Sequence, residues 1–306
     1  MSSDPLWTSA EIAAATGGTV SEDFSVFGLS IDTRTLDAGD LFVALKDIRD
    51  GHEFVANAFD EGAEGALVSR PIEGGPTVLV DDVLPALEKL GMAARDRAPD
   101  CFRSAVTGSV GKTSVKEMLA RIYRRLGPAH ANERSFNNQW GVPLTLARMP
   151  RDTRRAIFEI GMSTPGEIAP RSVMVQPHAA LITKIAPAHL EGLGSIEGVA
   201  KEKSDIFAGL VSGGVAVLPH EDKFRDYLAE QARKHQPDCR IQTFGMSREA
   251  DAYVNQIYTD HRATLSVYIM VHGAEVNVEL NAIGNHWALN AAAALLLACQ
   301  DDSVDV

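Results

Sequence analysis

Residues 107 to 114 read TGSVGKTS, between an apolar stretch at 102–106 and a run that predicts a helix starting near Lys112. Glycines in such a turn let backbone N–H groups approach phosphate oxygens, and the helix N-terminus adds partial positive charge. Lys112 is placed to reach the terminal phosphates, and the Thr113 hydroxyl to bind magnesium. The stretch therefore predicts an ATP-binding loop that consists of Gly108, Ser109, Val110, Gly111, Lys112, Thr113 and Ser114.

The match to the full phosphate-loop pattern is incomplete. That pattern has a further glycine where this chain has Val106, so only the GxxGK[ST] core is present. The placement between a strand and a helix supports the nucleotide-binding interpretation over a chance match. No NKxD motif is present, which argues against a GTPase.

Two polar residues follow other apolar stretches further along the chain. Residues 156–161 read AIFEIG, which places Glu159 at the end of a predicted strand, and residues 183–192 read TKIAPAHLEG, which places His189 after another. The carboxyl ends of parallel strands meet at one edge of a sheet, where open α/β sheets bind their ligands. Glu159 is therefore predicted to hold magnesium directly or through water, and His189 to be a second metal ligand.

The pattern of apolar runs predicts an α/β fold. Runs at 102–106, 156–160, 179–185 and 215–218 alternate with helical stretches, which is typical of a mostly parallel sheet flanked by helices. Three alternating runs within 252–280, with turns near residues 259–261 and at His272 and Gly273, predict an antiparallel meander attached to that sheet.

A smaller α/β unit is predicted upstream. Thr8 and Glu11 have capping-box spacing before a short helix, and further strands and helices are expected up to a helix at 83–98. Because Pro99 disfavours continuation of that helix, the boundary is placed there. Residues 1–98 are thus predicted to form an N-terminal domain and residues 99–306 a P-loop-type central domain.

Composition narrows the classes of function. The formal charge of -12 argues against a general nucleic-acid binder, which needs a basic surface. The three cysteines form no CxxC pair, and the first residues do not resemble a signal peptide, so a cytoplasmic location is expected. The most apolar segment, 287–299, is shorter than the roughly 20 residues of a membrane span and is interpreted as a buried helix.

Four stretches resemble the central ATPase domain of the Mur ligase family and occur in the same order. They are GSVGKTS at 108–114, FEIG at 158–161, APAHLEGLGSIEGVAKEKSDIF at 186–207 and GNHWALNAAAA at 284–294. The stretch NERSFNNQWGVPLTL at 132–146 is most similar to the branch that adds D-alanyl-D-alanine to a UDP-N-acetylmuramoyl-tripeptide. Upstream, IDTR at 31–34 and the segment 38–63 resemble the family's UDP-precursor-binding domain, so the resemblance covers nearly the whole chain.

The resemblance implies a role for each matching residue. Lys112 and Thr113 would handle the triphosphate of ATP and a first magnesium ion, with Glu159 also on the metal side. His189 would hold a second magnesium ion together with Lys203, which matches a lysine that is carbamylated in the family. The catalytic residues would be Lys112, His189 and Lys203. The remaining residues would bind ligands: His286 and Asn290 near the adenine, Asn137 and Asn138 near the muramoyl-peptide, and Thr33 and Arg34 near the UDP group.

Plainer interpretations exist for several of these residues. Lys203 could be a solvated helix lysine paired with Glu202 or Asp205. Asn137 and Asn138 could form a polar turn that fixes its own backbone, and Thr33 with Arg34 a surface turn.

The implied full-length activity is an ATP-dependent ligation in peptidoglycan precursor synthesis, by a monomer, through an acyl phosphate. Two departures bear on it: Lys184 replaces an amide residue of the family's TNIGPAH, and the chain stops at Val306 without the C-terminal ligase domain that receives D-alanyl-D-alanine. The isolated chain is therefore expected to ligate poorly. The alternatives are a sister amide ligase of the MurE or folylpolyglutamate synthase type, with residues 1–98 as the discriminating feature, and a non-catalytic nucleotide-binding regulator.

Overall fold

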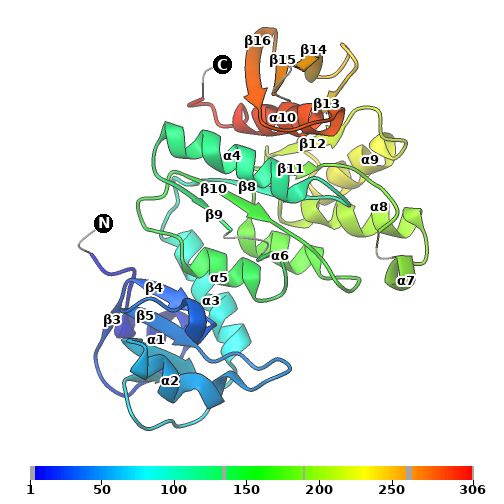
Figure 1. The fold of residues 1–306 in the computed structure, drawn as a ribbon. Coiled ribbons are helices and arrows are strands. Elements are labelled where there is room, and N and C mark those ends of the chain that lie inside the picture. Colours follow the sequence, from blue (N-terminus) through cyan, green and yellow to red (C-terminus); the bar gives the residue numbers. More distant parts are fainter. Residues whose placement is uncertain (1–3, 133–135, 189, 260–263, 305–306) are drawn as a thin grey trace. The chain divides into compact units, whose positions relative to one another are not determined.

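The computed structural model describes residues 4–132, 136–188, 190–259 and 264–304 (Figure 1). The chain forms two compact units, of which the first comprises Met1–Pro99 with Pro143–Asp152 and the second Asp100–Val142 with Thr153–Val306. The predicted domain boundary between residues 98 and 99 stays a prediction. No helix in the described ranges is long and apolar enough to cross a membrane.

The first unit is built on a five-stranded sheet in the order β2-β7-β6-β5-β4, in which only β2 is antiparallel to its neighbour. Thr8 and Glu11 form the predicted capping box at the start of the first helix, which ends at Gly17 in the left-handed conformation. The elements are β1 (Trp7–Thr8), α1 (Ser9–Thr16), β2 (Thr19–Val20), β3 (Ser25–Val26), β4 (Gly28–Ser30), η1 (Thr33–Thr35), β5 (Asp40–Val43), η2 (Gly51–Phe54), α2 (Val55–Asp60), β6 (Gly65–Val68), β7 (Thr77–Leu79) and α3 (Val83–Asp96).

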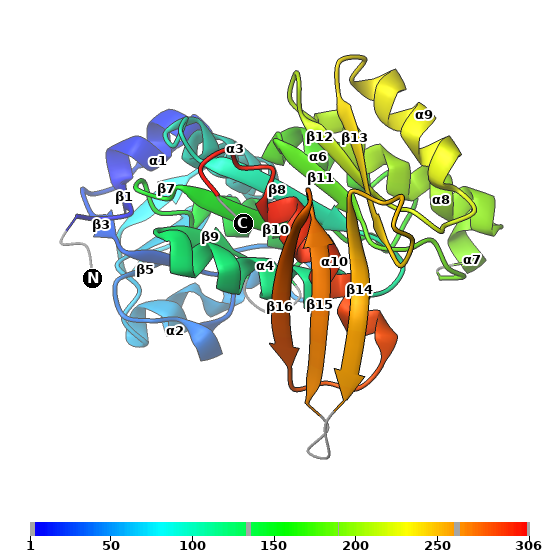
Figure 2. The same cartoon turned by 90° about the horizontal axis from the view of Figure 1, so that it is seen from above.

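The second unit is built on a nine-stranded sheet in the order β16-β15-β14-β13-β12-β11-β8-β10-β9. The strands from β9 to β14 in this order are parallel, and β14, β15 and β16 form the predicted antiparallel meander (Figure 2). The fold class predicted from the sequence is therefore confirmed. The elements are β8 (Phe102–Thr107), α4 (Lys112–Leu126), β9 (Ala129–Ala131), β10 (Arg155–Glu159), α6 (Ile168–Val175), β11 (Ala179–Ile182), α7 (Leu190–Leu193), α8 (Ile196–Ser204), η3 (Asp205–Gly209), β12 (Val215–Pro219), α9 (Arg225–His235), β13 (Arg240–Gly245), β14 (Ala252–Thr259), β15 (Leu265–Val271), β16 (Ala274–Leu280) and α10 (Asn285–Ala298). Helix α5 (Gly141–Ala147) begins in this unit, and its residues from Pro143 onward belong to the first unit.

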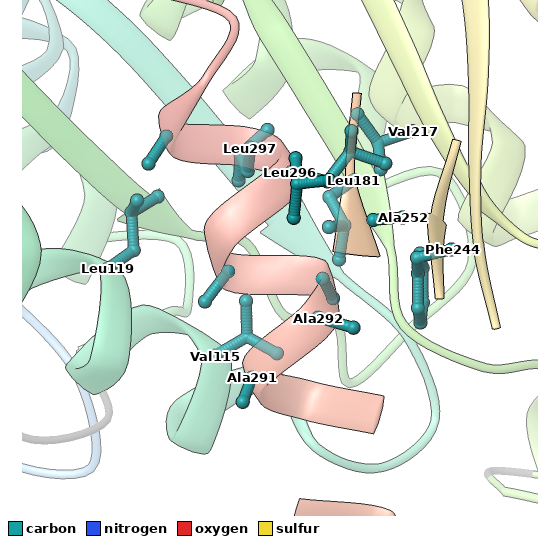
Figure 3. Close-up of a cluster of buried hydrophobic side chains, with 14 of the residues drawn as sticks. Val115, Leu119, Leu181, Val217, Phe244, Ala252, Ala291, Ala292, Leu296 and Leu297 are labelled. Carbon is teal, nitrogen blue, oxygen red and sulfur yellow. The ribbon is translucent and has the colours of Figure 1, made fainter. Parts of the chain in front are cut away.

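Helices cover both faces of the parallel part of this sheet. On one face, α10 lies between side chains of α4, such as Val115 and Leu119, and strand side chains such as Leu181 and Val217 (Figure 3). Alanines along α10 permit this close approach because they add little bulk between the helices and the sheet. On the other face, α6 and η3 pack against β8 and β11, and α9 packs against β12. The double cover explains why these strands read as continuous apolar runs.

Strand β11 is shorter than the sequence predicted. The run 179–185 predicted a strand to Ile185, but β11 ends at Ile182. Thr183 still donates its backbone N–H to Thr107 at the end of β8 (2.9 Å). The next two residues bond to loops: Lys184 accepts a hydrogen bond from the Ser109 N–H (2.9 Å), and Ile185 donates one to the Asp222 carboxylate (3.0 Å). The predicted turn at His272 and Gly273 is confirmed by positive φ angles of 48° and 88°.

Candidate functional site

Two glycines shape the loop between β8 and α4. Gly108 has φ 144° and Gly111 has φ 86°, conformations that favour glycine. A Cβ atom on Gly108 would overlap the Thr183 hydroxyl, and one on Gly111 would lie 2.8 Å from the Asn290 Oδ1. The loop therefore passes directly against Thr183, which follows β11, and against α10, with no room for larger residues at these two glycines.

The loop is fastened to the segment that follows β11. The Ser109 hydroxyl donates to the Ala186 carbonyl (2.8 Å) and accepts from the Ala186 N–H (3.0 Å). The Thr183 hydroxyl donates to the Val110 carbonyl at 2.5 Å. These bonds hold the backbone that leads toward residue 189 beside the phosphate loop. His189 itself lies outside the described residues, so its predicted metal role stays a prediction.

Glu159 ends β10 and lies beside the first turn of α4. β10 and β8 are parallel neighbours, with Glu159 opposite Val106, which brings the carboxylate to the edge where the loop begins. Its side chain is 1% exposed and accepts hydrogen bonds from the Thr113 hydroxyl (3.2 and 3.0 Å to Oε1 and Oε2) and from the Asn137 amide (2.7 Å). A hydroxyl and a carboxylate are the hard oxygen ligands that magnesium prefers.

The Thr113 and Glu159 pair is the feature that fits a magnesium ion. In the described ranges, no three His, Cys, Asp or Glu side chains form a metal-binding group. A magnesium ion commonly uses only one or two protein ligands and completes its shell with water and phosphate oxygens. The two-oxygen arrangement suits an ion that arrives with a nucleotide.

Lys112, the first residue of α4, points its ammonium group back over the loop. Its Nζ donates to the Gly108 carbonyl at 2.8 Å. Burial lowers the pKa of Lys112, and the negative charge of Glu159 partly opposes that shift. A desolvated ammonium at a helix N-terminus provides concentrated positive charge for an anionic ligand.

Lys203, on α8, is buried near this cation. Its side chain is 1% exposed, and the pKa of Lys203 falls to about 8 because of burial first and the positive charge of Lys112 second, with Glu202 opposing. Glu202 instead accepts hydrogen bonds from the backbone N–H groups of Gly166 (2.8 Å) and Ile168 (3.4 Å). The interpretation of Lys203 as a solvated surface lysine is therefore wrong.

The family described as the Mur ligase middle domain matches residues 106–298, which contain the loop, Glu159 and Lys203. The chain belongs to the Mur ligase family. It is 37% identical over 286 residues to a UDP-N-acetylmuramoyl-tripeptide--D-alanyl-D-alanine ligase of Escherichia coli, and 34% identical over 279 residues to the ligase of the same name in Bacillus subtilis. Each alignment covers 90% of this chain but only 60% and 58% of the relatives, so the chain spans less than two thirds of their length.

A solved structure of MurF from Acinetobacter baumannii superposes on this Mur ligase with a TM-score of 0.84 and 32% identity. The superposition covers 97% of this chain and 65% of that structure.

Two asparagines of this Mur ligase lie just before α5. Asn137 bonds to Glu159 through its side chain and accepts the Gly161 N–H on its carbonyl (2.9 Å). A Cβ atom on Gly161 would lie 2.8 Å from the Asn137 Cγ, so that glycine makes the approach possible. The Asn138 side chain accepts the Gly141 N–H at 3.0 Å and so fixes a local turn. The structure thus places the Asn137 amide against the Glu159 carboxylate, a contact that could not be predicted from the sequence.

The other predicted ligand-binding residues are divided between the two units. Asn290 lies beside Gly111, and this close approach is possible because the glycine has no side chain. His286 is exposed, and its ring centroid lies 5.7 Å from that of Trp287. Thr33 and Arg34 lie in η1 of the first unit, where Arg34 forms an exposed ion pair with Asp32 (2.6 Å).

Proposed function

We propose that this Mur ligase chain provides the ATP-handling and precursor-binding parts of a UDP-N-acetylmuramoyl-tripeptide--D-alanyl-D-alanine ligase, which acts in the cytoplasm in peptidoglycan precursor synthesis. The observation that carries the proposal is the phosphate loop with the Thr113 hydroxyl in contact with the buried Glu159 carboxylate. The similarity to relatives of that name over most of the chain favours this activity over a sister ligase.

The proposed reaction has two steps. The tripeptide carboxylate attacks the γ-phosphorus of ATP, which forms an acyl phosphate and releases ADP. The amine of D-alanyl-D-alanine then attacks the acyl carbon, forms the amide and releases phosphate. The first step brings an anionic carboxylate against the anionic phosphates of ATP. In the second step the attacking amine is neutral, but negative charge develops on the acyl oxygen and on the departing phosphate. Both steps therefore require fixed positive charge near the phosphates. Lys112 supplies one such charge at the N-terminus of α4.

Magnesium would supply further positive charge that neutralises the phosphate oxygens. Thr113 and Glu159 would hold the first ion, because their oxygens already converge in the structure. His189 and a carbamylated Lys203 would hold the second. Carbamylation converts the lysine cation into an anion, which suits a buried position near a second cation.

The remaining assignments follow the family pattern. We propose that His286 and Asn290 bind the adenine, that Asn137 and Asn138 contact the muramoyl-peptide, and that Thr33 and Arg34 contact the UDP group. The position of Asn290 beside Gly111 supports the first assignment. The protein is proposed to act as a monomer.

Lys203 is expected to take up carbon dioxide as a carbamate. At pH 8 about half of amines with a pKa near 8 are neutral, against about one in 300 at the ordinary value of 10.5, and only the neutral amine reacts. After incubation with ¹³C-bicarbonate, ¹³C NMR should show a carbamate signal that disappears in Lys203→Arg. The signal should persist in Lys201→Arg, which changes an exposed lysine of the same helix. A signal that survives in Lys203→Arg would place the carbamate elsewhere.

Product analysis tests the proposed activity as a whole. With ATP and magnesium, the protein is expected to convert UDP-N-acetylmuramoyl-tripeptide and D-alanyl-D-alanine to the pentapeptide. Mass spectrometry should find no product when both substrates are exchanged, either for UDP-N-acetylmuramoyl-L-alanyl-D-glutamate with 2,6-diaminopimelate or for a folate with glutamate. Product from either pair would indicate a sister ligase, and nucleotide binding without any precursor-dependent hydrolysis would indicate a regulator.

A further inference from the structure

A second lysine of α4, Lys116, lies one helical turn after Lys112 and is completely buried. Its side chain is 0% exposed, and its Nζ donates to the Asn132 carbonyl at 2.9 Å and to the Glu117 carboxylate at 2.5 Å. Burying an ammonium group is costly unless its donors are satisfied, so this residue is held in a definite place. Nothing in the reaction proposed above uses it.

Lys116 bonds to the backbone carbonyl of Asn132, and the side chain of Asn132 in turn bonds to Glu159. The Asn132 Oδ1 accepts the Glu159 N–H at 2.7 Å, and the Asn132 Nδ2 donates to the Phe136 carbonyl at 2.5 Å. Phe136 directly precedes Asn137, whose amide donates to the Glu159 carboxylate at 2.7 Å. Asn132 thus holds the backbone of Glu159 and Asn137 holds its side chain, and the Asn132 carbonyl is in turn bonded by Lys116.

We propose that Lys116 is a positioning residue for the Glu159 carboxylate and acts through Asn132. The inference rests on the proposed function in one respect, namely that Glu159 holds magnesium. Helix α4 then fixes both halves of the site: its first residues carry Lys112 and Thr113, and its second turn fixes the carboxylate that faces them.

The physical reason is the sensitivity of metal sites to the groups behind their ligands. Loss of an outer-shell partner typically lowers metal affinity by about 10- to 100-fold, because the ligand then samples orientations that do not bind. The Lys116 Nζ bonds to Asn132 and Glu117, whereas the Gly108 carbonyl is bonded by Lys112. Loss of the Lys116 side chain should therefore weaken the metal-dependent part of nucleotide binding and leave the phosphate-binding loop in place.

The test measures ADP affinity by calorimetry in excess EDTA and across a magnesium titration. In Lys116→Met, which keeps the length of the side chain and removes its donors, the magnesium concentration for half-maximal tightening should rise about tenfold. The affinity for ADP in EDTA should remain within about twofold of the wild type, because the loop is not altered. Lys234→Met, which changes an exposed lysine on α9, is the matched control and should behave as the wild type.

Asn132→Ala provides a second and independent variant, which decides the matter if Lys116→Met does not fold. It removes the amide that bonds to Glu159 and should show the same shift in magnesium dependence, and the double variant should be no worse than the more affected single one. An equal loss of affinity with and without magnesium, or no loss in either variant, overturns the positioning role. If the wild type itself shows no magnesium-dependent ADP binding, the proposed function fails first.

Discussion

Lys112→Ala is expected to lower precursor-dependent ATP hydrolysis by about a thousandfold, since removal of one group that stabilises a developing negative charge has effects of this size. In the structure Lys112 is partly buried, and its ammonium group donates to the Gly108 carbonyl. Burial already lowers the pKa of Lys112, so the cation is poorly solvated before any ligand binds. The phosphates of the bound nucleotide would take the place of the missing water around the Lys112 ammonium group. Lys112→Ala removes this favourable interaction entirely.

The measurement is the rate of phosphate release with the UDP-precursor and the dipeptide both present. The melting temperature should change by no more than a few degrees, because the substitution also removes the cost of a partly buried charge. Lys234→Ala serves as the surface control. Hydrolysis within about tenfold of the wild type in Lys112→Ala would show that the loop does not act on the reacting phosphates.

Gly108→Ala is expected to destabilise the second unit by about 3 kcal/mol, from backbone strain together with overpacking. The φ of 144° is a conformation that residues with a side chain rarely adopt, and the added methyl group would overlap the Thr183 hydroxyl and lie 3.1 Å from the Thr183 nitrogen. For a unit of this size the melting temperature should fall by about 6 to 12 °C. Nucleotide binding should be lost, because the loop must move to relieve the overlap.

Gly213→Ala is the reference for a positive φ without a close approach. Gly213 has φ 68°, and a Cβ there would meet nothing within 4 Å, so only the left-handed strain of about 1 kcal/mol should appear. Calorimetric unfolding of both variants gives the added cost at Gly108, which combines its less accessible φ with the close approach to Thr183. Combining Gly108→Ala with Thr183→Ala should recover part of it, and equal losses in Gly108→Ala and Gly213→Ala would contradict the steric account.

Much of the fold was predictable because local signals and periodicity agree with the final structure. The Thr8 capping box, the apolar strand before Gly108 and the His272-Gly273 turn each depend on neighbours in sequence, and each is confirmed. The site was predictable to the extent that parallel strands must end at one edge, which places Glu159 beside Thr113. Strand β13 was missed because its sequence, RIQTFG, is largely polar.

The contacts that fix the site were not predictable, because they join residues far apart in the sequence. The bond from the Asn132 side chain to the Glu159 backbone spans 27 residues, and that from Thr183 to the Val110 carbonyl spans 73. Asparagine, threonine and lysine are common in turns and on surfaces, so nothing local marks them as buried supports. The glycines were the one available signal: Gly161 leaves the space that Asn137 fills.

Strand β16 ends the nine-stranded sheet on the side away from the nucleotide loop, and it presents hydrogen-bonding groups that no further strand in the described ranges covers. Its outward residues, Glu275, Asn277 and Glu279, alternate with partly buried Ala274, Val276, Val278 and Leu280. An open sheet edge can recruit a strand from another molecule and so begin aggregation, and charged side chains oppose this by mutual repulsion. The acidic character of β16 is thus a safeguard against fibre-like self-assembly at high concentration.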